Sequence, residues 1–134
     1  MYTTPYHPGD ISDKSFLISG GAGFIGSHIV EYLVSFNAGR IVVLDNLATG
    51  DIENIKPFIE AGKVSFIEGD ITDAADCAKA CEGIDFISHQ AALGSVPRSL
   101  KYPAATHAAN ATGFLNMLVA AKEAGVKRFV YASS

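Results

Sequence analysis

The sequence predicts an α/β fold in which five parallel strands form a doubly wound sheet. Three observations predict it. Short apolar, β-branched runs alternate with stretches of helical periodicity. The centres of these runs are continuously apolar, as in strands that are covered on both faces. A glycine-rich turn joins the first run to the first helical stretch, and 134 residues are enough for one domain.

The predicted strands cover residues 15–19, 40–45, 64–68, 84–89 and 128–132. Strands that alternate with helices lie parallel and are joined by right-handed crossovers. In the usual order of such a sheet, 3-2-1-4-5, the fifth strand lies at an edge. No helix follows it to cover one of its faces, so we expect the domain at residues 15–134 to be incomplete.

The stretches between the strands predict four helices. The first covers residues 24–36 and places one apolar stripe toward the sheet, made of Ile25, Ile29, Leu33 and Phe36. The second, at residues 51–61, contains Pro57, so we expect a short or broken helix. The third begins at the capping pair Thr72 and Asp73. The fourth is rich in alanine and covers about residues 103–124.

Composition and charge exclude several classes of protein. Ten Lys and Arg stand against 14 Asp and Glu, giving a net charge of -4, and no basic cluster occurs. A nucleic-acid or anionic-membrane partner is therefore not expected. No apolar run reaches the roughly 20 residues that a membrane span needs.

The first 14 residues and the cysteines point to the cytoplasm. Residues 1–14 are polar and lack the apolar segment of a secretory signal, so we expect an extension that docks loosely or frays. Cys77 and Cys81 are too few for a disulfide framework. They share one helix face and are expected as buried hydrophobes, and no metal site is expected.

The glycine-rich turn at residues 20–26 has the spacing G-x-x-G-x-x-G between a predicted strand and a predicted helix. Gly20 allows a tight turn, Gly23 lets a pyrophosphate approach the backbone, and Gly26 lets the helix pack closely on the strand. Free amides and the helix dipole then face the phosphates. The pattern in this context predicts a dinucleotide site.

Asp45 indicates which dinucleotide binds. It ends the second strand about 20 residues beyond the last glycine, where a carboxylate can accept hydrogen bonds from both ribose hydroxyls. No basic residue stands beside it, since Asn46, Leu47 and Ala48 follow. A 2′-phosphate would meet an uncompensated negative charge. The sequence therefore predicts NAD rather than NADP.

Beyond these features, the chain from residue 16 to 134 resembles the extended short-chain dehydrogenase/reductases, and among them the nucleotide-sugar epimerases and dehydratases. The residues that carry the resemblance lie at 20–26, 44–47 (LDNL), 68–71 (EGDI), 89–92 (HQAA), 110–113 (NATG) and 129–134 (FVYASS). The resemblance implies a Rossmann-type fold and NAD as the cofactor.

The resemblance also implies site residues. Those implied at the cofactor, besides the three glycines, are Phe24 and Ile25 at the pyrophosphate; Asp45, Asn46, Thr49 and Gly50 at the adenosine ribose and its phosphate; Asp70 and Ile71 at the adenine; Gln90, Ala91 and Ala92 at the nicotinamide; and Asn110 at a ribose. Ser95 and Arg98 are implied toward the sugar. Ser134 is implied to orient the substrate hydroxyl.

Several of these residues have plainer interpretations. Asp70 could only cap a strand end, Arg98 could be a solvated loop charge, and Asn110 could bond back inside its helix. His89 is more simply a strand-end histidine whose hydrogen bonds are satisfied than a proton shuttle. The other histidines, His7, His28 and His107, show no partner pattern.

The loop at residues 89–99 and the segment 45–50 most resemble UDP-N-acetylglucosamine 4-epimerases of surface-polysaccharide pathways. UDP-glucose 4-epimerases commonly carry a lysine where this sequence has Gly94. The implied reaction is epimerisation of a UDP-sugar through a transient 4-keto sugar, in a homodimer. A dehydratase or decarboxylase of the same family, or a stand-alone NAD-binding module, remains an alternative.

The catalytic pair of the family, Tyr-x-x-x-Lys, does not occur in the 134 residues. The C-terminal substrate domain of the family is also absent from them. We therefore expect this chain to be the NAD-binding part of a larger enzyme and to be inactive by itself.

Overall fold

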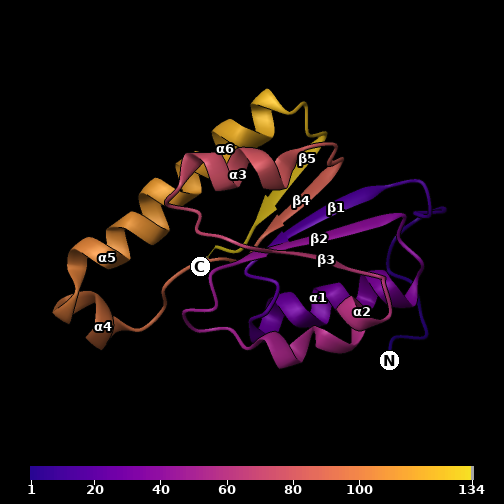
Figure 1. Ribbon diagram of the computed structural model, residues 1–134, viewed down its shortest axis with the longest axis horizontal. Helices are drawn as coiled ribbons and strands as arrows, with labels where there is room; N and C mark the ends of the chain where they lie inside the picture. The colour runs from indigo at the N-terminus through magenta and orange to yellow at the C-terminus, as the bar shows by residue number, and fades with distance from the viewer. Residues whose placement is uncertain (134) are drawn as a thin grey trace.

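A five-stranded parallel sheet forms the centre of the chain in the computed structural model, which describes residues 1–133. The strands are β1 (Ser15–Ser19), β2 (Arg40–Asp45), β3 (Ser65–Glu68), β4 (Phe86–His89) and β5 (Arg128–Tyr131). Their order is β3-β2-β1-β4-β5 (Figure 1). The predicted fold class and strand order are confirmed, with strand ends that differ by one or two residues.

Helices cover both faces of this sheet. α1 (Phe24–Ser35) and α2 (Lys56–Glu60) lie on one face, and α3 (Ala74–Cys81) and α6 (Phe114–Glu123) lie on the other (Figure 1). Successive residues of β1 enter different cores: Leu17 packs with the α3 and α6 residues and Ile18 with those of α1. Burial on both faces explains why the strand sequences are continuously apolar.

Two helical regions differ in detail from their predictions. The stretch at 51–61 is broken, as expected, into a 3-10 turn η1 (Ile52–Asn54) and the short α2, with Pro57 in its first turn. The fourth helix is not continuous. It consists of α5 (Pro103–His107), a π-helical segment η2 (Ala108–Gly113) and α6, and it is preceded by α4 (Val96–Lys101), which the sequence analysis missed.

α1 buries the predicted stripe only in part: Leu33 is buried and Ile29 packs against the core, but Ile25 does not. Its buried residues are Gly26, Val30 and Leu33, whereas Ile25 is 60% exposed. The reason is steric: Gly26 packs against the turn that follows β1, and its neighbours one helical turn on follow it inward. The buried face of α1 is therefore rotated away from Ile25, which lies on the side of the helix near Tyr2 and Tyr6.

Residues 1–14 make more contacts than a fraying extension would. Ile11 packs against the core on the α1 face, and its carbonyl oxygen accepts a hydrogen bond from the Gly39 amide (3.1 Å). The Tyr6 amide donates to the hydroxyl of Tyr32 on α1 (2.8 Å). These contacts attach the extension to the rest of the chain, although most of its residues are exposed, and its loose docking stays a prediction.

The two cysteines are buried, as predicted, on the α3 face of the sheet. Burial raises the pKa of the Cys77 thiol to about 12 and that of Cys81 to about 11, so both are protonated at neutral pH. Across residues 1–133, no helix is long and apolar enough to cross a membrane.

Candidate functional site

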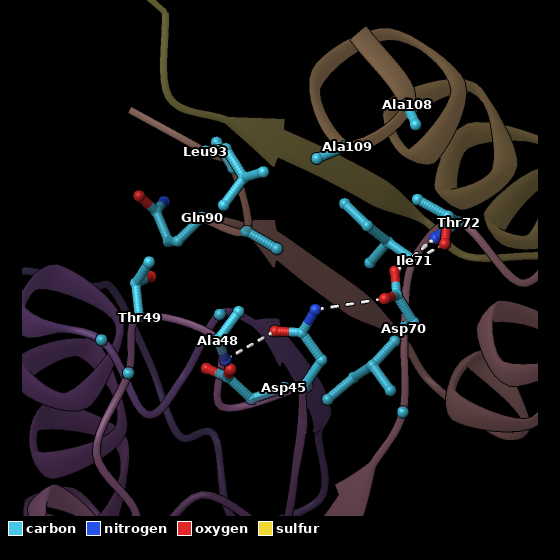
Figure 2. A pocket seen from close by; sticks show the side chains of 18 of the residues that line it. Asp45, Ala48, Thr49, Asp70, Ile71, Thr72, Gln90, Leu93, Ala108 and Ala109 are labelled. Carbon is cyan, nitrogen blue, oxygen red and sulfur yellow. Dashed lines mark hydrogen bonds between the residues drawn. The ribbon is translucent and has the colours of Figure 1, made fainter. Parts of the chain in front are cut away.

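A cleft of about 310 Å³ opens at the carboxyl ends of the strands, within the range of about 300–1,000 Å³ typical of small-molecule sites. The residues that line it are Gly20, Gly23, Leu44, Asp45, Asn46, Ala48, Thr49, Gly50, Gly69, Asp70, Ile71, Thr72, Gln90, Ala91, Ala92, Leu93, Ala105, Ala108 and Ala109. Asp70, Ile71 and Thr72 lie at one end of the cleft and Gln90 at the other (Figure 2). Ligands of open α/β sheets bind at this edge.

The turn between β1 and α1 is built around two glycines that permit no side chain. A Cβ on Gly20, which has a φ of +71°, would lie 2.7 Å from the Ala91 amide nitrogen. A Cβ on Gly26 would lie 2.1 Å from the carbonyl oxygen of Gly20. These close approaches place β1, the start of α1 and the loop after β4 against one another.

Gly23 is different, because the protein itself hardly needs a glycine there. Its backbone is extended (φ -76°, ψ 177°), and a Cβ would meet only the Gly20 carbonyl oxygen at 3.3 Å. Gly23 lines the cleft and is the N-cap of α1, so no side chain caps that helix. Among residues 1–133, no acceptor pairs with the amides of Phe24, Ile25 or Gly26. The absent side chain leaves room in front of unpaired donors.

The carboxylate of Asp45 is tied to this turn. One oxygen accepts a hydrogen bond from the Ala22 amide (3.0 Å), and the other accepts one from the Leu47 amide (2.9 Å). The second bond closes a turn in which Leu47 has a φ of 59°. Each oxygen keeps a free lone pair. The carboxylate is therefore oriented in advance and can still accept hydrogen bonds from a ligand.

A second carboxylate follows on the neighbouring strand. Asp70 comes after β3 and accepts hydrogen bonds from the amide (2.9 Å) and hydroxyl (2.8 Å) of Thr72 and from the Asn46 side chain (3.1 Å). The hydrogen bond from the Thr72 amide, first of all, lowers the pKa of Asp70 below its usual value. Asp70 is thus charged at neutral pH, and among residues 1–133 no Lys or Arg lines the cleft.

The loop after β4 closes the other end of the cleft. Ser19, the last residue of β1, is paired with His89, the last residue of β4. The Ser19 hydroxyl accepts hydrogen bonds from the amides of Gln90 (3.2 Å) and Ala91 (3.3 Å) and lies 2.7 Å from His89 Nδ1. Because both lone pairs of the hydroxyl are used, it donates its proton to Nδ1. This fixes the neutral form of His89, with its proton on Nε2.

The surroundings of the His89 ring agree with that assignment. The ring is buried and packs against Phe114 and Phe129. Burial lowers its pKa to about 4. His89 therefore acts as a buried hydrogen-bond acceptor at neutral pH rather than as a proton carrier.

The cleft brings most of the predicted cofactor residues together, and Gly26 lies directly behind it. Phe24 and Ile25 offer only their backbone to it, since their side chains are 80% and 60% exposed and point toward Tyr2 and Tyr6. Asn110 lies outside the cleft. Its amide group pairs with the backbone of Leu93 in both directions (2.8 Å each). A ribose contact by Asn110 stays a prediction.

The residues predicted toward the sugar lie on α4, away from the lining of the cleft. The Ser95 hydroxyl accepts a hydrogen bond from the Arg98 amide (3.3 Å), and the Arg98 guanidinium donates to the Gly94 carbonyl (3.1 Å). Ser95 has a φ of 93°, which is rare outside glycine. Their roles stay predictions. Ser134 lies outside the described residues.

Several lining residues were missed by sequence reasoning. Thr72 could have been found, because a Thr two residues after an Asp commonly closes a hydrogen-bonded turn. Ala105, Ala108 and Ala109 are spaced as one helix face, and their small side chains allow the helix to border the cleft. No sequence signal indicated that this face lies against the cleft, because it depends on the path of the chain after β4.

Three comparisons with known proteins agree on one family. A model described as "NAD dependent epimerase/dehydratase family" matches residues 16–134. A UDP-glucose 4-epimerase of Lactobacillus helveticus is 40% identical over 120 residues, which is 88% of this chain and 34% of that protein. UDP-glucuronic acid decarboxylase 3 of Arabidopsis thaliana is 40% identical over 119 residues, covering 88% and 33%.

Comparison with solved structures finds the same kind of enzyme. The crystal structure of the Thermus thermophilus UDP-glucose 4-epimerase in complex with NAD superposes with a TM-score of 0.79 and 41% identity, over 90% of this chain and 37% of that one. The chain thus spans about a third of the length of these relatives.

The burial of His89 makes stability depend on pH. The unfolded chain binds a proton at His89 near pH 6.5, whereas the folded chain does so only near pH 4. As pH falls from 6.5 to 4, the free energy of unfolding should therefore fall by up to about 3 kcal/mol from this residue alone. Urea unfolding at a series of pH values measures it. His89→Phe should remove this part of the slope; equal slopes of the two proteins would contradict the account.

Proposed function

Because the chain belongs to the NAD-dependent epimerase/dehydratase family, we propose that it is the NAD-binding part of a nucleotide-sugar 4-epimerase. The observation that carries the proposal is the link between Asp45 and the glycine turn. The hydrogen bond from Ala22 to Asp45 places an oriented carboxylate beside three uncapped helix amides. An adenosine ribose and a pyrophosphate are adjacent groups of one molecule, and they need these two partners side by side.

The pyrophosphate would lie against Gly23 and the amides of Phe24 and Ile25. Those amides donate along the helix axis, where the positive end of the dipole favours an anion. Because Gly23 has no side chain, the backbone can come within hydrogen-bond distance of phosphate oxygens. The turn binds and orients the ligand through its backbone alone, and it contributes no proton.

The ribose and adenine would lie over β2 and β3. Asp45 would accept hydrogen bonds from the ribose hydroxyls with the lone pairs that Ala22 and Leu47 leave free. Asp70 and Ile71 would take the adenine, with Thr72 and Asn46 holding the Asp70 carboxylate in place. Two carboxylates and no cation in the lining favour a free 2′-hydroxyl over a 2′-phosphate, and so favour NAD over NADP.

The nicotinamide would lie beside Gln90, Ala91 and Ala92, where Ser19 fixes the loop. NAD, when bound, supplies the reversible hydride transfer on which epimerisation at a sugar carbon depends. What the chain itself contributes there is position: the loop and the helix residues Ala105, Ala108 and Ala109 border the site.

We propose a UDP-hexose as the substrate, with Ser95 and Arg98 oriented toward it. The UDP-glucose 4-epimerase match supports this class. The loop around Gly94 resembles the corresponding loop of enzymes that act on UDP-N-acetylglucosamine. Decarboxylation is the second candidate reaction, because the Arabidopsis decarboxylase is as similar as the epimerase in this part of the chain.

A homodimer and a cytoplasmic location belong to the same proposal. Leu115, Leu118 and Val119 are exposed on α6 at the spacing of one helix face, which supports pairing through this helix. The two cysteines are free thiols, which is the usual state in a reducing compartment.

Titration of the protein with NAD+ and NADP+ tests the choice of cofactor. The wild type should prefer NAD+, and Asp45→Ala should lose about tenfold or more in NAD+ affinity, because hydrogen bonds to a charged group are worth about 1.5–3 kcal/mol each. Asp45→Asn keeps the shape of the side chain and removes its charge, so it should reduce the preference for NAD+ over NADP+. Asp51→Asn, an exposed cap outside the cleft with the same charge change, is the control. Equal affinity of the wild type for both dinucleotides would contradict the role of Asp45.

The glycine turn allows folding and binding to be separated. Gly26→Ala should lower the free energy of unfolding by more than about 3 kcal/mol, because its methyl group would overlap a backbone carbonyl. Gly23→Ala should stay within about 1 kcal/mol of the wild type, yet lose NAD+ binding because its methyl group fills the space before the amides. Thermal unfolding and calorimetric titration measure the two effects. A Gly23→Ala protein that binds NAD+ normally would contradict the proposed pyrophosphate position.

A further inference from the structure

Residues 1–14 lie outside the part of the chain that the family model matches, which begins at residue 16. Their aromatic side chains lie along α1, the helix whose first turn would hold the pyrophosphate. The inference drawn from this contact concerns how α1 is held in place, and it rests on the proposed function.

Tyr32 of α1 is the centre of this contact. Its hydroxyl accepts a hydrogen bond from the Tyr6 amide (2.8 Å) and is also paired with Nδ1 of His7. An amide can only donate, so the hydroxyl proton is available for the His7 nitrogen. One side chain therefore joins α1 to two successive residues of the extension. Removing its oxygen would break both bonds.

Aromatic packing surrounds the same side chain. Tyr2 and His7 contact the Tyr32 ring edge-on, with centroids 5.4 and 5.6 Å away, and Tyr6 stacks on it at 6.2 Å. His7 also packs on Phe36, which ends α1 (5.4 Å). These contacts add to the packing of Tyr32 against the core on the α1 face of the sheet.

α1 needs this support more than a well-capped helix would. It has no side-chain cap, no acidic residue in its first turn and no basic residue in its last turn. A helix of 12 residues is marginal by itself and depends on packing for its position. In the first turn of α1, Gly26 is the one buried residue. It lies so close to the carbonyl group of Gly20 that no space remains between the two.

We propose that Tyr32 is a positioning residue for the dinucleotide, through which residues 1–14 clamp α1. The clamp holds Tyr32 and Phe36 near the end of the helix, and Tyr2 and Tyr6 also lie beside Phe24 and Ile25 of the first turn, where the phosphate amides lie. Because a helix moves as a rod, a shift at the clamped end tilts the amides out of line with the cleft. None of Tyr2, Tyr6, His7 or Tyr32 lines that cleft, so their effect on the ligand is transmitted by α1.

NAD+ affinity provides the test, measured by titration calorimetry at a temperature at which circular dichroism shows each protein folded. Tyr32→Phe keeps the ring and removes the hydroxyl, and it should weaken NAD+ binding about three- to tenfold, the effect of one or two hydrogen bonds. Deleting residues 2–8 should weaken it at least as much. In that shortened chain, Tyr32→Phe should have no further effect, because its partners are gone. Tyr102→Phe, an exposed tyrosine outside the cleft, is the control.

Amide hydrogen exchange gives a second readout. Tyr32→Phe should speed exchange in α1 and leave α6 unchanged, because α6 packs on the other face of the sheet. If the shortened chain does not fold, Tyr32→Phe and His7→Ala in the full chain decide the matter, since both leave the core intact.

Normal NAD+ affinity in folded Tyr32→Phe, or a Tyr32→Phe effect that persists in the shortened chain, would overturn the clamp while leaving the proposed function in place. A wild-type protein that binds no NAD+ would overturn the proposed function and the clamp with it.

Discussion

The close approach of α1 to the end of β1 is the constraint on which the rest of the site depends. The helix can begin beside the sheet only because Gly26 lets the Gly20 carbonyl oxygen sit where a Cβ would otherwise be. Gly20 in turn lets the loop after β4 come equally close. The end of β1, the start of α1 and the loop after β4, which is distant from the other two in sequence, therefore meet at one point. The cleft is what remains open between them, and Gly20 and Gly23 form part of its floor.

Hydrogen bonds then orient the polar groups around that floor. Asp45 is held by the turn, Asp70 by its own turn and by Asn46, and the Gln90 loop by Ser19. Each partner is a backbone amide or a short side chain, so little side-chain entropy is lost when a ligand arrives. Among residues 1–133, no Lys or Arg of the lining balances the two carboxylates, and this imbalance is the basis of the proposed preference for a dinucleotide without an extra phosphate.

The sequence was sufficient for what depends on local pattern. Continuous apolar runs predicted the sheet order, and the glycine turn and the strand-ending aspartate predicted Gly20, Gly23 and Asp45 of the cleft. The other lining residues that were expected came from the family resemblance. It was insufficient where tertiary contacts decide. The rotation of α1 follows from a contact of Gly26 that no periodicity shows, and hydrophobic period alone favoured Ile25 as a buried residue. The π-helical turn contains Asn110, whose amide pairs with Leu93, 17 positions back along the chain. Such pairs leave no trace in a single sequence.

The misplaced stripe of α1 and the ordered N-terminal residues have one cause. Once Gly26 takes the position against the sheet, Ile25 is exposed and Ile29 and Tyr32 are only partly buried, and uncovered apolar surface costs stability. The aromatic residues at 2, 6 and 7 cover part of that side, while Ile11 enters the core beneath it. The packing of the extension and the glycine turn therefore have a common origin. The contact of Gly26 with the turn leaves the proposed phosphate site open at the start of α1 and, on another side of the helix, leaves the surface on which residues 1–14 pack.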